Sequence, residues 1–87
     1  MSAEIRNIIS KNKEISRSLQ KFRSSNREYQ RLLNKDWRTL SDKQIKDLDK
    51  KTDRVNSEMA KHYTKVRNHL VKNGINKRTA HNFIMNN

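Results

Sequence analysis

The chain contains neither cysteine nor proline, and Gly74 is its only glycine. Without cysteine, it can form neither a disulfide nor a thiolate metal site. The lack of proline and of glycine-rich turns argues against a β fold and predicts long helices. Only 31% of the 87 residues are hydrophobic, so the core must be small. We therefore expect an all-α protein, with no hydrophobic run of the ~18 residues that a membrane span needs.

The sequence also lacks the patterns that enzymes and metal sites use. Its acidic residues are scattered among bases or stand at expected helix starts, and no glycine-rich phosphate loop is present. His62 and His69 are seven residues apart, whereas metal ligands on one helix face are normally three or four apart. We expect no enzyme activity, no metal and no cofactor.

Positive charge is what the chain has in excess. Its formal net charge is +12, and no acidic residue follows Glu58. Such a charge is typical of proteins that bind polyanions, DNA and RNA foremost. An acidic protein is the alternative partner. Since the first residues lack the hydrophobic segment of a signal peptide, we expect an intracellular, DNA-associated protein, in a nucleus, nucleoid, mitochondrion or virion.

Apolar spacing and capping signals divide the chain into helices. A stripe of isoleucine, leucine and phenylalanine predicts a helix over about residues 3–23. Ser25 and Glu28 have the spacing of a capping box, which predicts a new helix over about residues 26–38. Ser41 and Gln44 repeat that spacing and predict a long helix to about Asn73.

The C-terminal residues carry the signals of a helix end and a restart. Gly74 stands where a left-handed residue would end the long helix, and Ile75 would make the accompanying hydrophobic contact. Asn76 could cap a short fourth helix over about residues 76–85. We accordingly divide the chain into a three-helix domain, residues 1–73, and a basic C-terminal turn and short helix, residues 74–87.

A strict a/d heptad offers an alternative interpretation. It consists of Ile5, Ile8, Asn12, Ile15, Leu19, Phe22, Asn26, Tyr29 and Leu33. In this interpretation the first helix continues through Ser24 and Ser25, and two asparagines fix the register of a coiled-coil dimer. The molecule would then be a long helical hairpin that forms a coiled-coil dimer or docks on an acidic protein.

Residues 29–44 resemble part of a high-mobility-group (HMG) box. They combine a short helix with Trp37 near its end, then Leu40, a Ser41 cap and a long charged helix. Ile5 and Ile8 occupy the places of the paired aromatics of the family's first helix. The resemblance covers about residues 3–65 and implies an L-shaped three-helix module packed around Trp37.

The resemblance also implies binding in the DNA minor groove. Family members bend DNA with apolar wedges, and the wedge positions fall near Arg6 and on Asn26, which are polar. We therefore expect an architectural or packaging protein with little sequence specificity and reduced bending. The expected DNA-binding residues on the first two helices are Arg6, Asn7, Lys11, Lys13, Arg17, Asn26, Arg27, Gln30, Arg31, Lys35 and Arg38.

Overall fold

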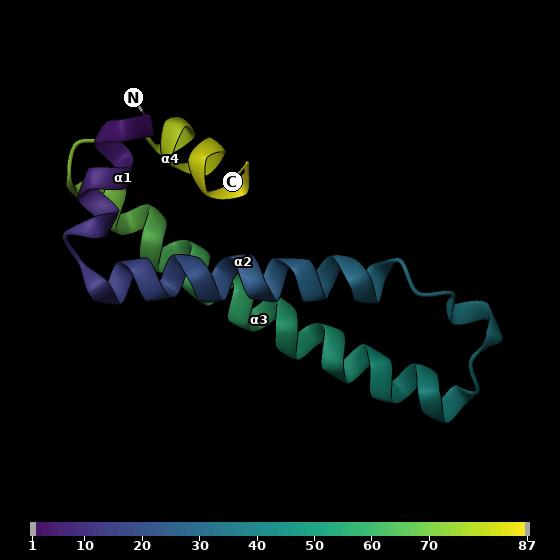
Figure 1. Ribbon diagram of the computed structural model, residues 1–87. Helices are drawn as coiled ribbons and strands as arrows, with labels where there is room; N and C mark the ends of the chain where they lie inside the picture. The colour runs from purple at the N-terminus through teal and green to yellow at the C-terminus, as the bar shows by residue number, and fades with distance from the viewer. Residues whose placement is uncertain (1, 87) are drawn as a thin grey trace.

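The computed structural model describes residues 2–86, and this part of the chain is helical without a strand (Figure 1). Its α-helices are α1 (Ser2–Ser10), α2 (Lys13–Leu33), α3 (Asp42–Lys72) and α4 (Lys77–Met85). One turn of 3₁₀ helix, η1 (Trp37–Thr39), lies between α2 and α3. The all-α expectation is confirmed. Every helix in residues 2–86 is too short or too polar to cross a membrane.

The two longest helices form an antiparallel hairpin. Glu14 near the start of α2 forms an ion pair with Lys65 near the end of α3, and Glu28 lies 3.5 Å from Lys51 nearer the hairpin turn. Residues farther along α2 thus meet residues earlier in α3. The short helices α1 and α4 pack at the open end of this hairpin, and the molecule measures 48 × 19 × 17 Å (Figure 1).

The helix break expected at Ser24–Ser25 is wrong. Helix α2 runs through both serines, and the chain breaks instead at Lys11–Asn12. There the Asn12 Oδ1 atom accepts hydrogen bonds from the backbone N–H groups of Glu14 and Ile15, at 3.1 and 3.2 Å. Asn12 is therefore the N-cap of α2, because its side chain satisfies donors that the first helical turn leaves free.

Ser25→Ala tests whether Ser25 lies inside a helix or caps one. Because Ser25 lies inside a helix, alanine is expected to raise the free energy of unfolding by about 0.3–0.5 kcal/mol. Ser41→Ala is the matched control, because Ser41 forms the capping box with Gln44 and its loss is expected to cost about 1 kcal/mol. Urea denaturation measures both. A loss of about 1 kcal/mol in Ser25→Ala would show that Ser25 is a cap after all.

The helix expected over residues 26–38 ends before it reaches Trp37. Helix α2 ends at Leu33, and Trp37 begins η1 in the connection to α3. The indole is partly buried, and its Nε1–H donates to the Leu32 carbonyl at 3.2 Å. It packs on a small cluster near the hairpin turn, formed by Leu32, Leu48 and Val55. Trp37 therefore closes the turn and does not stand at the centre of the main core.

The end of α3 follows the signals in the sequence. Gly74 has a φ of +90°, the Ile75 N–H donates to the Leu70 carbonyl at 3.0 Å, and the Gly74 N–H donates to Val71 at 3.0 Å. This pair of hydrogen bonds is a Schellman motif, which favours glycine at the left-handed position. Ile75 is buried, as expected, and the Asn76 side chain caps α4 through the Arg78 N–H. The motif turns α4 back onto the hairpin.

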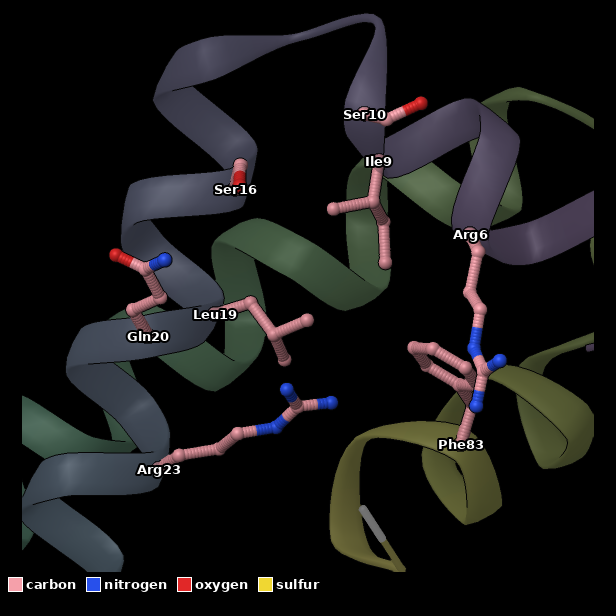
Figure 2. Close-up of a pocket in the computed structure, with 8 residues that line it drawn as sticks. All are labelled: Arg6, Ile9, Ser10, Ser16, Leu19, Gln20, Arg23 and Phe83. Carbon is pink, nitrogen blue, oxygen red and sulfur yellow. The ribbon is translucent and has the colours of Figure 1, made fainter.

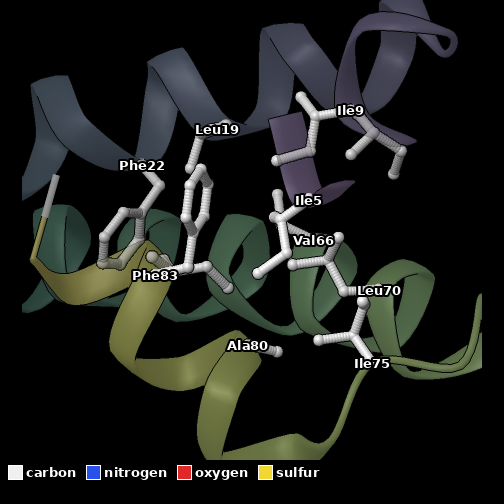
Figure 3. Packing of buried hydrophobic residues seen from close by; sticks show 11 residues of the cluster. Ile5, Ile9, Leu19, Phe22, Val66, Leu70, Ile75, Ala80 and Phe83 are labelled. Atoms are coloured by element: carbon white, nitrogen blue, oxygen red, sulfur yellow. The ribbon is translucent and has the colours of Figure 1, made fainter. Parts of the chain in front are cut away.

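The main core lies where all four helices meet, at the open end of the hairpin (Figure 3). Ile5 of α1, Val66 and Leu70 of α3 and Ile84 of α4 are at most 1% exposed. Phe22 of α2 lies in the same cluster. Residues 75–84 thus share one core with α1, α2 and α3, because α4 covers the face of α3 that α2 leaves open.

The hairpin of the alternative interpretation describes α2 and α3 better than an L of three helices does. Ile15, Leu19 and Phe22 of the heptad are buried, as its core positions should be. Two other heptad positions are not core positions, because Asn12 is a helix cap and Leu33 is 50% exposed. The HMG-box arrangement is not confirmed, since the predicted first helix is divided at Asn12 and its second part is continuous with the predicted second helix.

Candidate nucleic-acid interface

Basic side chains from α2 and α3 meet along one side of the hairpin. The residues lining this hollow, which we call the basic groove, are Lys13, Glu14, Arg17, Ser18 and Lys21 of α2 and Lys61, His62 and Lys65 of α3. Its volume is about 510 Å³. Five of the eight lining side chains are lysine or arginine, all of them exposed, so the groove presents a concentrated positive charge to solvent.

Helix periodicity explains the α2 side of the basic groove. Lys13, Arg17 and Lys21 are four residues apart, so they lie in one row on the helix surface. The row rises about 6 Å per step and spans about 12 Å along the axis. Three base-pair steps of DNA occupy about 10 Å at 3.4 Å each. The row is therefore long enough to neutralise several consecutive phosphates of one strand.

The α3 side depends on the hairpin register. Lys61 and Lys65 are one turn apart, and the pairing of Lys65 with Glu14 places them opposite the α2 row. Between the two rows lie Ser18 and His62, which are 4% and 8% exposed. The His62 Nε2 atom lies 3.2 Å from the Glu58 carboxylate, and its buried Nδ1 atom has no hydrogen-bond partner. The floor of the groove is thus polar.

Within the part of the chain that the structure describes, Glu14 is the one carboxylate that lines the basic groove. A hydrogen bond from Lys65, together with the positive charge of that lysine, lowers the pKa of the Glu14 carboxyl. The carboxylate therefore stays ionised at neutral pH and offsets one lysine. Because its pKa is lowered by folding, the pair contributes to stability above the unfolded-state pKa and loses that contribution as the pH falls through the folded-state value.

The residues expected from sequence do not share one surface. Lys13 and Arg17 line the basic groove, whereas Arg27 and Arg31 line a separate hollow on α2. Arg6 lines a different pocket, beside α1. The remaining members of the set are scattered: exposed Asn7 on α1, Lys11 in the α1–α2 turn, half-buried Asn26 and exposed Gln30 on α2, and Lys35 and Arg38 at the hairpin turn.

Arg38 illustrates why position matters as well as charge. Its Nε atom lies 3.2 Å from Asp36 Oδ1 within the connection between α2 and α3, so its charge is offset locally. By contrast, Lys21, Lys61 and Lys65 line the basic groove and were not among the expected residues. Two sequence signals could have found them. Lys21 continues the four-residue spacing of Lys13 and Arg17, and Lys61 and Lys65 lie in the segment without acids.

No metal-binding arrangement accompanies the basic groove. Among the residues that the structure describes, no three side chains of histidine, cysteine, aspartate or glutamate are placed to hold a metal ion. The ammonium and guanidinium groups that line the groove attract anions and donate hydrogen bonds to oxyanions. Comparison of the chain with family models, curated proteins and solved structures finds no match.

Proposed function

We propose that this protein is a non-enzymatic nucleic-acid-binding protein that holds the phosphate backbone of DNA in the basic groove. The proposal is supported mainly by one observation: five cationic side chains from two helices line one hollow, and Glu14 is the one acidic residue among its described lining residues. Phosphate contacts position a protein on DNA without determining sequence. We therefore propose that the protein binds DNA with little sequence specificity and has a packaging or architectural role.

The proposal is based on charge and on shape and does not depend on the HMG-box resemblance. Phosphate neutralisation releases counterions, so the logarithm of affinity falls with the logarithm of salt concentration by about 0.9 for each contact. Four or five groove contacts would give a slope of about −4 on duplex DNA. This slope distinguishes phosphate binding from a hydrophobic association, which would change little with salt.

Fluorescence anisotropy of a labelled duplex, measured from low to physiological salt, tests the proposal. We expect binding at low salt and a steep, linear loss of affinity as salt is added. RNA and polyglutamate serve as competitors, RNA to compare the two nucleic acids and polyglutamate to represent an acidic protein. Failure to bind DNA at low salt, or stronger competition by polyglutamate than by unlabelled DNA, would contradict the proposal.

The alternative, a dimer that docks on an acidic protein, has less support from the surface. Leu33 and Met85 are the large hydrophobic side chains that are exposed among residues 2–86, and they lie on different helices. Stable dimer interfaces generally bury a contiguous, partly apolar patch of about 800 Å² on each partner. We therefore propose a monomer, which sedimentation equilibrium would distinguish from a dimer.

Glu14→Gln is expected to strengthen DNA binding. The substitution removes the carboxylate that lines the basic groove and releases Lys65 to contact phosphate. Since the pair is exposed and screened by solvent, we expect a modest affinity gain of about two- to fivefold at low salt and a steeper salt slope. Glu4→Gln on α1, which removes an equal charge outside the groove, is the control. An equal gain in both variants would show that only net charge matters.

A further inference from the structure

A second pocket lies on the other side of α2 from the basic groove. This arginine pocket is lined by Arg6, Ile9 and Ser10 of α1, by Ser16, Leu19, Gln20 and Arg23 of α2 and by Phe83 of α4 (Figure 2). Its volume is about 360 Å³, at the small end of the range for ligand sites. The buried stripe of α2, which includes Ile15 and Phe22, separates it from the groove.

Two arginines from different helices converge in this pocket. Figure 2 shows the Arg6 side chain extending from α1 and the Arg23 side chain extending from α2 into the same gap beside Phe83. Among residues 2–86, no carboxylate side chain lines the pocket. Two guanidinium groups near each other repel, so an anion between them would relieve that repulsion and accept their hydrogen bonds.

Arg23 also carries a donor that the protein leaves unsatisfied. Its Nε atom is buried and has no hydrogen-bond partner, although buried N–H groups nearly always have one. The Ser16 hydroxyl and the Gln20 amide line the same pocket and can also donate to an oxyanion, whereas the Ser10 hydroxyl already donates to the Asn7 carbonyl at 2.9 Å. The pocket thus combines two guanidinium groups with neutral donors, as sites for small oxyanions do.

We propose that the arginine pocket binds a phosphate monoester. A monoester carries close to two negative charges at neutral pH, which matches Arg6 and Arg23. A diester carries one charge and has a chain on both sides of the phosphate, whereas Ile9, Leu19 and Phe83 form an apolar wall that suits the carbon skeleton of a single substituent. The proposal does not depend on DNA binding in the basic groove, because its residues and its ligand are different.

Two-dimensional NMR of the arginine Nε–H groups, with inorganic phosphate and phenyl phosphate as probes, tests the pocket directly. We expect saturable shifts of the Arg23 and Arg6 signals, larger with phenyl phosphate because its ring contacts the apolar wall. Sodium chloride at equal ionic strength is the reference titration. Shifts that do not saturate, or that sodium chloride reproduces, would overturn the proposal.

Substitution of the arginines gives an independent test. Arg23→Gln and Arg6→Gln are expected to weaken phenyl phosphate binding by about tenfold or more, since each removes a charged donor. Arg27→Gln is the matched control, because Arg27 lies one turn farther along α2 and is exposed outside the pocket. Circular dichroism verifies that each variant remains folded. Equal weakening of binding in Arg23→Gln and Arg27→Gln would show that only net charge matters and would overturn the proposal.

The monoester could come from a free nucleotide or from the phosphorylated end of a nucleic-acid strand, and a third experiment distinguishes them. Adenosine monophosphate is titrated first, and then 5′-phosphorylated and 5′-hydroxyl forms of one oligonucleotide are compared. Tighter binding of the phosphorylated form, lost in Arg23→Gln, assigns the pocket to strand ends. Equal binding of both forms with saturable adenosine monophosphate binding assigns it to free nucleotides. Absence of both effects would contradict the proposal.

Discussion

Replacement of Arg17, Lys21 and Lys61 by alanine is expected to weaken DNA binding by about a hundredfold at moderate salt and to lower the salt slope by about three. These side chains come from both sides of the basic groove, and each is exposed, so their removal should disturb the fold little. The loss arises because three phosphate contacts, and the counterions that they release, disappear together. Anisotropy titrations at several salt concentrations measure both quantities.

The matched control removes the same charge from the other end of the hairpin. Lys43, Lys46 and Lys50 are exposed residues in the first half of α3, interspersed with Asp42, Asp47 and Asp49. Their triple replacement by alanine also lowers the net charge by three, but it leaves the basic groove intact. We expect a loss of affinity of less than about tenfold and a small change in slope. Similar losses in the two triple variants would show that the groove has no special role.

Ile84→Ala is expected to unfold most of the protein at room temperature. Ile84 is 1% exposed and belongs to the main core, together with Ile5, Val66 and Leu70. Truncation of a buried isoleucine costs about 2–5 kcal/mol. A domain of this size rarely has more than about 3–5 kcal/mol of stability, so the substitution removes most or all of it. Far-UV circular dichroism and urea denaturation measure the loss.

Met85→Ala is the adjacent control. Met85 follows Ile84 on α4 but is 44% exposed, so its truncation should change the free energy of unfolding by less than about 0.5 kcal/mol. Trp37, at the opposite end of the hairpin, reports whether the effect spreads through the molecule. Loss of helix in Ile84→Ala with an unchanged Trp37 emission spectrum would mean that α4 unfolds alone. A cooperative fold requires both signals to change together.

Local signals predicted the helical nature of the chain and several of its boundaries. Three of these signals are present in the structure: the Ser41 capping box, the left-handed Gly74 and the Asn76 cap. Each of them acts within a few residues of the chain. Such features can be recognised in sequence because their hydrogen bonds join near neighbours along the chain.

The position of the first helix break could not be decided in that way. Ser25 and Asn12 are both good capping residues, and local preference does not choose between them. The structure uses Asn12, so that Ile5 and Ile9 of α1 fold back over the core while Leu19, Phe22 and Leu32 stay on one continuous helix facing α3. Continuity through Ser24 and Ser25 is maintained by packing against α3, because burial of these apolar side chains outweighs the gain from one cap.

The sequence by itself determined that this is an all-α protein with a net charge of +12, and it predicted an affinity for polyanions. Tertiary structure alone decided which charges lie together. Lys61 and Lys65 lie opposite Lys13, Arg17 and Lys21 because of the register of the hairpin. Arg6 lines the same pocket as Arg23 because α1 folds back beside α2. The physical reason is that electrostatic sites depend on distances between side chains far apart in sequence, which only the packing of the apolar core establishes.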